Sequence, residues 1–345
     1  MNDSVKQQKL DPMWRLAETI QARYGLEPII QGSPLSGGEW KTLWRLTGTQ
    51  QSYVVSVSHP TASLESIAYE HRLLSYLHTA LPQVPMPLLA TDDSSYFLDE
   101  GQLISLYPFM PGEMADSSQV RLSAARLLAN FHEVGQRFPD QAPRPGVPPR
   151  HAWDWCATEW PLIEEALASS LTATSGIGQR FWQAAGEWAS PIRERQGQIK
   201  AERAYFQQWL AELTHTSPTL TSGLVHDDYH DNNLLAEGEQ ITALLDWDDC
   251  HPDWLVLDLS NGMWEFCHVG EILDITAARA FLQAYTEAGG PVKPAEFALL
   301  IPFIRCRRMI EVMVSLRGMV TGGPWDESPD YLVHNLLSLE NLRTV

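Results

Sequence analysis

The chain has 345 residues, of which 44% are hydrophobic and 19% are charged. This length allows two compact lobes with buried cores, and the composition is that of a soluble globular protein. The formal net charge of −19 argues against nucleic acid as a partner, because nucleic-acid binding needs a basic patch and no basic run stands out in the sequence. The same acidity weakly favours a small cationic ligand.

Neither an export signal nor a membrane anchor is predicted. The N-terminus is polar, and the strongest apolar run, residues 297–304, is too short to cross a bilayer. Cys156, Cys250, Cys267 and Cys306 form no C-x-x-C pair and are expected to be reduced, mostly buried thiols. We therefore expect a cytoplasmic protein with no membrane contact. The sequence predicts no oligomeric state.

The first third of the chain predicts a small lobe built on an antiparallel sheet. An amphipathic helix is expected over 12–24 and a second helix over 64–79, where apolar residues recur at helical spacing before a run of prolines. A glycine-rich turn at 36–39 separates the first two strands. The expected strands are 28–31, 42–46, 52–57, 96–98 and 103–109.

From residue 120 onward the patterns are mostly helical. The expected helical segments are 122–134, 157–171, 178–196, 198–214, 277–288 and 295–319. A proline-rich loop at 138–150 interrupts them, as does a stretch at 223–259 that contains short β-like runs. The sequence thus predicts an α+β fold, with an N-terminal lobe over residues 1–109 and a mostly helical C-terminal lobe over residues 110–345.

The stretch 224–259 carries many ionisable groups between short apolar runs, which is costly beside a core unless the groups act together. Asp228 and Asn233 lie five residues apart on a predicted loop, and Asp246 follows a short apolar run. A hairpin turning at residues 237–239 would return Asp246 beside Asn233. Their amide and carboxylate oxygens suit Mg²⁺, and Asp228 could accept the proton of a substrate hydroxyl.

Three short motifs carry a resemblance to a known family. HDDYHDNN (residues 226–233) has the pattern H-x-D-x-x-x-x-N and resembles the catalytic loop of the aminoglycoside phosphotransferase and choline kinase family. LDWD (245–248) resembles its second magnesium motif, and LDL (257–259) resembles its downstream structural aspartate, which supports the loop. The resemblance covers roughly residues 28–320. It implies a protein-kinase-like fold of two lobes, with ATP as co-substrate and Mg²⁺ as cofactor.

The same resemblance implies a role for each matching residue. Asp228 would be the catalytic base, Asn233 and Asp246 the magnesium ligands, and His226 a brace for the loop. The residues expected around the nucleotide are Gly37 and Gly38 over the phosphates, Glu70 as partner of a strand lysine, and the hinge from Tyr107 to Met110 against adenine.

One departure from the family pattern concerns the third strand. Ser56 stands where the family places a lysine or arginine. A serine can neither pair with the α- and β-phosphates nor neutralise Glu70. Either Lys41, just past the glycine turn, reaches the phosphates instead, or the protein is a weakly active or non-catalytic pseudokinase that only binds nucleotide.

The expected reaction is transfer of the ATP γ-phosphoryl group to a hydroxyl of a small, amine-bearing molecule. Residues 257–267 vaguely resemble the homoserine-kinase branch of the family, so amino alcohols such as homoserine come first, followed by aminoglycosides and choline-like compounds. Six tryptophans between residues 153 and 209 could add an aromatic box for an ammonium group, although packing on helix faces explains them more simply.

A metal-dependent hydrolase is the rival enzyme class. His226, His230 and His251, together with Asp228, could be read as ligands of zinc or iron. The neighbouring aspartates and Asn233 favour a hard cation instead, and the sequence has no H-E-x-x-H motif.

Overall fold

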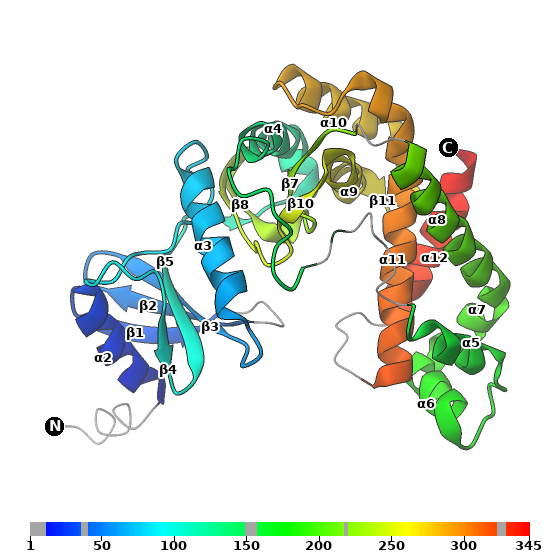
Figure 1. Ribbon diagram of the computed structural model, residues 1–345, viewed down its shortest axis with the longest axis horizontal. Helices are drawn as coiled ribbons and strands as arrows, with labels where there is room; N and C mark the ends of the chain where they lie inside the picture. Colours follow the sequence, from blue (N-terminus) through cyan, green and yellow to red (C-terminus); the bar gives the residue numbers. More distant parts are fainter. Residues whose placement is uncertain (1–11, 36–40, 148, 150–156, 217–219, 323–328) are drawn as a thin grey trace. The chain divides into compact units, whose positions relative to one another are not determined.

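The structure is a computed structural model that describes residues 12–35, 41–147, 149, 157–216, 220–322 and 329–345. The chain divides into two compact units (Figure 1). The first unit contains Met1–Val120, Arg144–Val147 and Asp231–Asp249, and the second contains Arg121–Pro143, Pro148–His230 and Cys250–Val345. The lobe boundary after residue 109 stays a prediction, because the units also draw on segments from later in the chain.

The first unit is built on a five-stranded antiparallel sheet with the strand order β1-β2-β3-β5-β4. Its strands are β1 (Ile29–Pro34), β2 (Lys41–Gly48), β3 (Ser52–Ser58), β4 (Phe97–Asp99) and β5 (Gln102–Pro108). Tyr53 and Val55 point from β3 into an apolar core shared with Ile20 of helix α2 (Pro12–Tyr24). All five predicted strands and the first predicted helix are confirmed.

Helix α3 (Leu64–His78) packs against the opposite face of this sheet. It begins after Ser63, whose hydroxyl accepts the Ser66 N–H at 3.0 Å and so caps the helix. The buried His71 reaches Ser105 and Tyr107 of β5, with Nε2 3.3 Å from the Ser105 hydroxyl and 3.1 Å from the Tyr107 hydroxyl. Because side chains alternate along a strand, these two residues face away from the core that contains Ile104 and Leu106.

A three-stranded sheet with the order β6-β8-β9 completes the first unit. Its strands are β6 (Glu113–Met114), β8 (Leu234–Glu237) and β9 (Gln240–Leu244). Strands β8 and β9 form a hairpin in which Glu237 faces Gln240 and Gly238 has a φ of 62°. Glycine adopts this left-handed conformation without steric cost. The hairpin predicted from the sequence is confirmed, including the position of its turn.

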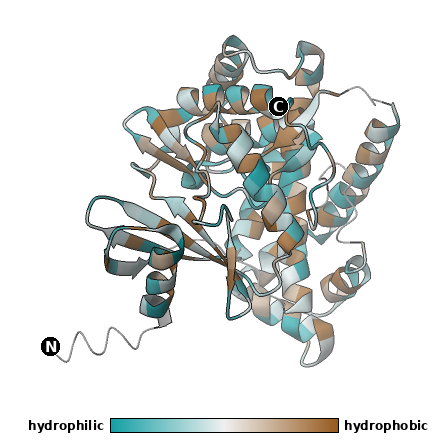
Figure 2. Cartoon of the chain, turned by 60° about the vertical axis from the view of Figure 1, so that its left-hand side comes forward, coloured by the Kyte–Doolittle hydropathy of each residue, from teal (hydrophilic) through white to brown (hydrophobic). Residues whose placement is uncertain are grey.

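The second unit is mostly helical. Its helices are α4 (Ser117–Gly135), α5 (Trp160–Ala168), α6 (Gly176–Ala185), α7 (Ala189–Glu194), α8 (Gln196–Thr216), α9 (Leu255–Cys267), α10 (Ile275–Glu287), α11 (Leu300–Thr321) and α12 (Pro329–Asn341). Helix α11 contacts α5, α6, α8, α9 and α12 and is the centre of this unit (Figure 1). Hydrophobic and hydrophilic residues are interspersed along most helices (Figure 2). The predicted α+β fold is thereby confirmed.

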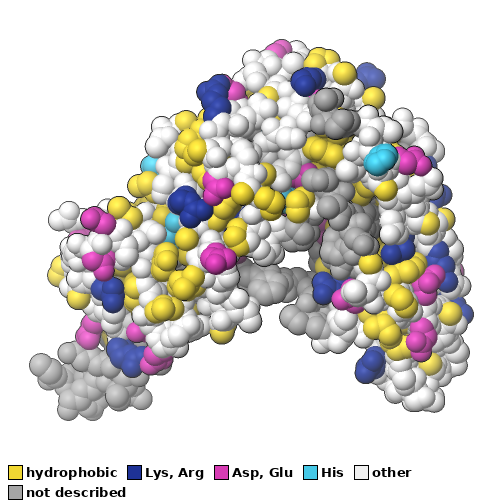
Figure 3. Space-filling view, in the orientation of Figure 1, with side chains coloured by type: hydrophobic (Ala, Val, Ile, Leu, Met, Phe, Trp, Pro, Cys, Tyr) yellow, Lys and Arg dark blue, Asp and Glu magenta, His cyan; other side chains and the backbone are white. Residues whose placement is uncertain are grey.

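Two short antiparallel pairs complete the second unit. Strand β7 (Ser222–Val225) pairs with β10 (His251–Trp254), and β11 (His268–Val269) pairs with β12 (Ile272–Leu273). None of the described helices has both the length and the apolar content needed to cross a membrane. On the face shown in Figure 3, Lys and Arg side chains are scattered among Asp and Glu rather than gathered in one patch.

The helical predictions were wrong at three places. The single segment expected over 178–196 is broken, because α6 ends at Gly186, whose φ of 55° and ψ of −127° leave the helical region. The segment expected from residue 295 starts as a 3₁₀ turn, Pro294–Leu299, and becomes α-helical only at Leu300. The stretch 255–259, expected to be irregular, instead opens helix α9.

Candidate active site

The β8–β9 hairpin makes Asn233 and Asp246 neighbours at its open end. Leu234 faces Leu244 in the strand register, and the next residue, Leu245, donates its N–H to the Asn233 carbonyl at 2.8 Å. Asp246 follows immediately and has a φ of 57°, which is unusual for a residue other than glycine. The hairpin therefore brings the backbones of Asn233 and Asp246 close together, and the amide and carboxylate oxygens that these residues carry are of the hard kind that Mg²⁺ prefers.

Asp228 lies on the loop that follows β7. Its carboxylate Oδ2 is 3.3 Å from the His230 Nε2 atom, and 36% of its side chain is exposed. Burial would raise the pKa of Asp228, but the hydrogen bond with His230 and the nearby charges of His230, Arg307 and His226 hold it well below its ordinary value. Asp228 is therefore a carboxylate at neutral pH, in the state that a proton acceptor requires.

The buried carboxylate of Asp258, near the start of α9, holds the backbone of this loop. It accepts the His226 N–H at 2.8 Å and the Asp227 N–H at 3.0 Å. It also lies 3.1 Å from His132 Nε2, and His132 Nδ1 lies 2.8 Å from the Tyr285 hydroxyl. Burial opposes ionisation of Asp258, yet these hydrogen bonds and the neighbouring histidines lower its pKa. The supporting role expected for this aspartate agrees with these contacts.

Tyr229, which sequence reasoning missed, anchors the loop from its other side. Its side chain is fully buried, and its hydroxyl donates to the Ala124 carbonyl of α4 at 2.8 Å. Gly262 of α9 leaves room for the ring, because a Cβ atom at Gly262 would lie only 3.2 Å from Tyr229 Cδ1. The only sign of this role in the sequence is an aromatic residue directly after the proposed base. Its hydrogen-bond partner, Ala124, lies 105 residues away in the sequence and could not be inferred.

A buried cluster of charges connects α3 with β2 in the first unit. Lys41 Nζ lies 3.0 Å from Glu70 Oε1 and also forms an ion pair with Asp248. Arg144, from the proline-rich loop, contacts the other oxygen of Glu70 at 2.7 Å and donates to the Trp247 carbonyl at 2.6 Å. Glu70 is thus held by two cations. Sequence reasoning identified Lys41 and Glu70 but missed Arg144.

The pKa shifts of this cluster follow from its contacts. Burial would lower the pKa of Lys41, but Glu70 and Asp248 raise it above its ordinary value. Burial would raise the pKa of Glu70, but Lys41 and Arg144 lower it. Burial does raise the pKa of Asp248 in spite of Lys41, and the charges of Glu70 and Asp246 add to the effect. Lys41 and Glu70 are therefore charged at neutral pH.

The remaining nucleotide residues expected from the sequence are only partly described. Gly37 and Gly38 lie outside the described residues. Ser56 is buried in the middle of β3, where it faces Leu43 of β2 and Ser105 of β5. Tyr107 belongs to β5, and Met110 follows that strand and is half-buried. Their roles toward a nucleotide stay predictions.

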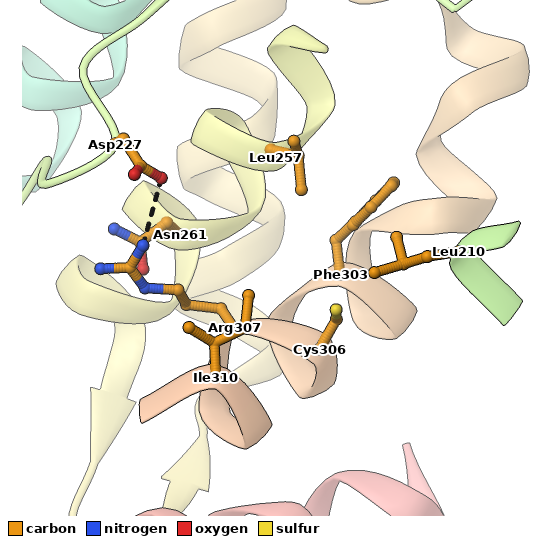
Figure 4. A pocket seen from close by; sticks show the side chains of 8 residues that line it. All are labelled: Leu210, Asp227, Leu257, Asn261, Phe303, Cys306, Arg307 and Ile310. Atoms are coloured by element: carbon orange, nitrogen blue, oxygen red, sulfur yellow. Dashed lines mark hydrogen bonds and ion pairs between the residues drawn. The ribbon is translucent and has the colours of Figure 1, made fainter. Parts of the chain in front are cut away.

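A small pocket in the second unit is lined in part by Asp227, from the loop that follows β7 (Figure 4). Asp227, at its polar end, is 7% exposed, has a φ of 66° and lies 3.1 Å from Arg307 Nη1. Arg307 also forms an ion pair with Glu311, one turn further along α11. The other lining residues are Leu210, Leu257, Asn261, Phe303, Cys306 and Ile310. Arg307 is therefore shared by two carboxylates of the second unit, those of Asp227 and Glu311.

Two of the six tryptophans make contacts inside the second unit, and an aromatic box for an ammonium group stays a prediction. Trp182 Nε1 donates to the Ser169 hydroxyl at 2.9 Å, and the ring of Trp209 packs edge-on against Phe303 at 4.9 Å. Trp153 and Trp155 lie outside the described residues. Within the part of the chain that the structure describes, no group of three or more His, Cys, Asp or Glu residues is arranged to hold a metal ion.

The α+β fold is the protein-kinase-like fold that solved small-molecule kinases share. Residues 31–297 match the phosphotransferase enzyme family (APH). The chain belongs to this family and is a small-molecule kinase, a phosphotransferase. The family resemblance noted in the sequence is thereby confirmed.

Curated relatives are homoserine kinases. The chain is 22% identical over 285 residues to the homoserine kinase of Rhodopseudomonas palustris (strain BisA53), covering 81% of this chain and 77% of the relative. It is 20% identical over 290 residues to the homoserine kinase of Gluconobacter oxydans (strain 621H), covering 82% of each.

Solved structures share the fold at low sequence identity. An amicoumacin kinase in complex with AMP-PNP, Ca²⁺ and Ami has a TM-score of 0.64 at 17% identity, covering 100% of this chain and 97% of that chain. A microcompartment-associated aminopropanol kinase has a TM-score of 0.63 at 18% identity, covering 96% of each. A spectinomycin phosphotransferase in complex with ADP and spectinomycin has a TM-score of 0.63 at 14% identity, covering 96% of this chain and 93% of that chain.

Proposed function

We propose that this kinase transfers the γ-phosphoryl group of ATP to a hydroxyl of a small, amine-bearing molecule. The observation that carries the proposal is the β8–β9 hairpin, which makes Asn233 and Asp246 neighbours at its open end. Asn233 and Asp246 would hold Mg²⁺, which supplies charge neutralisation at the phosphates when it is bound.

Asp228 is the proposed catalytic base. Its pKa lies below the ordinary value, so it carries the negative charge needed to accept the proton of an acceptor hydroxyl. Asp258 fixes the backbone of the two preceding residues, which limits the positions that Asp228 can take. His226 would be a positioning residue in this scheme; the contact given for it is the hydrogen bond from its backbone N–H to Asp258.

The pocket beside Asp227 is the proposed place for the amine of the acceptor. Asp227 brings a carboxylate to the polar end of this pocket, and carboxylates form charge-assisted hydrogen bonds with ammonium groups. The homoserine kinases among the relatives and the aminopropanol kinase among the solved structures act, by their names, on compounds that carry both an amine and a hydroxyl. Homoserine or a similar amino alcohol is therefore the first acceptor proposed.

The non-catalytic alternative has lost its main support. It depended on Ser56, which leaves the third strand without a cation for Glu70. Glu70 is nevertheless paired with Lys41 at 3.0 Å and with Arg144 at 2.7 Å.

A panel of matched acceptors tests the proposed function. ATP consumption and the phosphorylated product, detected by phosphorus NMR, are measured with L-homoserine, 1-amino-2-propanol, choline and spectinomycin, and with 4-hydroxybutyrate as the amine-free match for homoserine. We expect turnover with at least one amine-bearing alcohol, and at least a tenfold lower kcat/KM without the amine, because one lost charge pair costs about 1.4 kcal/mol or more. A preference for 4-hydroxybutyrate would contradict the amine assignment. Binding of ATP without product on any acceptor would favour the non-catalytic alternative.

A further inference from the structure

Ser56, where the family places a lysine or arginine, lies close to Lys41 on the neighbouring strand. Lys41 of β2 faces Ser58 of β3, while Ser56 faces Leu43. Residues paired across antiparallel strands point to the same face, so Lys41 and Ser56 are diagonal neighbours on one face of the sheet. Diagonal neighbours are about 7–8 Å apart, which a lysine side chain spans. Ser56 has a small side chain, which occupies less of this face than the family's lysine or arginine would.

We infer that Lys41 supplies from β2 the phosphate-binding cation that β3 lacks, and that Arg144 keeps Glu70 in place while Lys41 binds the nucleotide. The inference deepens the proposed function and rests on it. The ligand is the α/β-phosphate group of ATP, a polyanion that needs a compact, mobile cation, and a lysine ammonium on its flexible stem is such a group.

The position of Lys41 supports this role. Its ammonium lies 3.0 Å from Glu70 Oε1, and Glu70 is the α3 glutamate for which the family resemblance expects a lysine partner. Lys41 also pairs with Asp248, two residues after the proposed magnesium ligand Asp246. The lysine is thus held between α3 and the segment that carries Asp246, and its side chain is still 18% exposed.

Arg144 solves a problem that a single lysine would leave. When Lys41 forms ion pairs with the phosphates, its interaction with Glu70 would weaken. The Glu70 side chain is only 3% exposed, so its carboxylate would lose a partner inside the protein. An uncompensated buried charge destabilises a protein strongly. Arg144 remains 2.7 Å from the other oxygen of Glu70 and also holds the Trp247 carbonyl, so the helix and the segment before Asp248 stay connected. Arg144 is therefore a positioning residue.

A relocation experiment tests the inference. Lys41→Met is expected to lower kcat/KM for ATP by a hundredfold or more, because electrostatic stabilisation of this kind contributes about 10²–10³. Adding Ser56→Lys to Lys41→Met restores a lysine to the diagonal position and should recover at least tenfold of that loss. Arg72→Met removes an exposed cation from α3 on the side away from Glu70 and should leave kcat/KM for ATP within twofold of the wild type.

The positioning role of Arg144 is tested by comparing how its substitution changes KM for ATP and KM for the acceptor. Arg144→Met is expected to raise KM for ATP at least tenfold while KM for the acceptor stays within twofold, and Arg144→Lys should recover most of the loss because it keeps the charge. A merely structural role would instead lower the folded fraction, which reduces the apparent kcat and leaves both KM values unchanged, and this result would contradict the positioning role of Arg144.

The outcomes separate this inference from the proposed function. If the wild type is active and Lys41→Met has the same kcat/KM for ATP, the inference is overturned and the proposed function stands. Absence of ATP binding and turnover in the wild type would overturn both. If Lys41→Met unfolds, judged by circular dichroism, Lys41→Gln keeps a hydrogen-bonding group for Glu70 and is measured instead. A Lys41→Gln variant with wild-type kcat/KM for ATP would equally overturn the inference.

Discussion

Two aspartates hold left-handed backbone conformations next to the groups proposed for catalysis. Asp227, with a φ of 66°, directly precedes the proposed base, and Asp246, with a φ of 57°, is a proposed magnesium ligand. Each such conformation costs about 1–3 kcal/mol and persists only where the surroundings impose it. At Asp227 the surroundings are visible, because Asp258 binds its N–H and Arg307 binds its carboxylate. The left-handed conformation of Asp227 is therefore held by the contacts that its neighbours make with it.

Asp258→Asn tests how much the loop depends on its buried brace. The asparagine amide turns one acceptor oxygen into a donor, so at least one of the N–H groups of His226 and Asp227 or the ring of His132 loses its partner. We expect a loss of about 3 kcal/mol in the free energy of unfolding, measured by urea denaturation. Among molecules that remain folded, kcat should fall about a hundredfold because the base is misplaced.

Asp274→Asn is the matched control for this substitution. Asp274 also accepts two backbone N–H groups, from Thr276 and Ala277, but it is an exposed helix cap. Asparagine caps helices about as well as aspartate, so stability should change by less than about 0.5 kcal/mol. If Asp258→Asn changes stability and kcat as little as this control does, the hydrogen bonds of Asp258 to the loop are not needed for activity.

At the scale of single residues, the sequence identifies candidate catalytic and metal-binding residues better than it identifies the residues that contact and position them. Asp228, Asn233 and Asp246 stand in one short stretch with recognisable spacing. Arg144 lies 74 residues from Glu70, in a loop whose prolines indicate only the absence of regular structure. Nothing local in the sequence marks such a residue, because its role comes from the packing of distant segments.

The elements that were predicted well are those with strong local signals. Strand β3 is rich in valine, and the β8–β9 hairpin has a glycine at its turn, so both are determined by nearby residues. The break at Gly186 was missed because one glycine in a helical pattern is often tolerated. Only the surrounding packing decides whether the helix continues through it.

The contact between α3 and the sheet should make stability depend on pH. Burial lowers the pKa of His71 to about 4 from an ordinary value near 6.5. Between these values the unfolded chain takes up a proton that the folded protein does not, so stability is lost as the pH falls from about 6.5 toward 4. The difference amounts to about 3 kcal/mol over this interval.

His71→Gln isolates this effect. Glutamine can still form hydrogen bonds with Ser95 and Tyr107, but it cannot be protonated. The free energy of unfolding, measured by urea denaturation from pH 4 to pH 7, should fall less steeply on acidification in His71→Gln than in the wild type. Parallel curves for the two proteins would show that His71 does not carry the pH dependence.

At the scale of the whole molecule, the charge and the fold give different kinds of information. The net charge of −19 describes the average surface, yet the buried cluster around Glu70 holds the two cations Lys41 and Arg144. Inside this acidic protein two cations are therefore gathered at one place, where the carboxylates of Glu70 and Asp248 balance them. Composition alone could not show this, because the cluster is assembled from segments that are far apart in the chain.

Calorimetric titration of ATP in the presence of Mg²⁺, combined with turnover, tests the central assignment most directly. We predict that Asp246→Ala weakens ATP binding at least tenfold, through loss of a metal ligand. Asp228→Asn should bind ATP within twofold of the wild type while its kcat falls about a thousandfold, as for the loss of a general base. Wild-type Mg²⁺-dependent affinity in Asp246→Ala, or near-normal turnover in Asp228→Asn, would contradict the account.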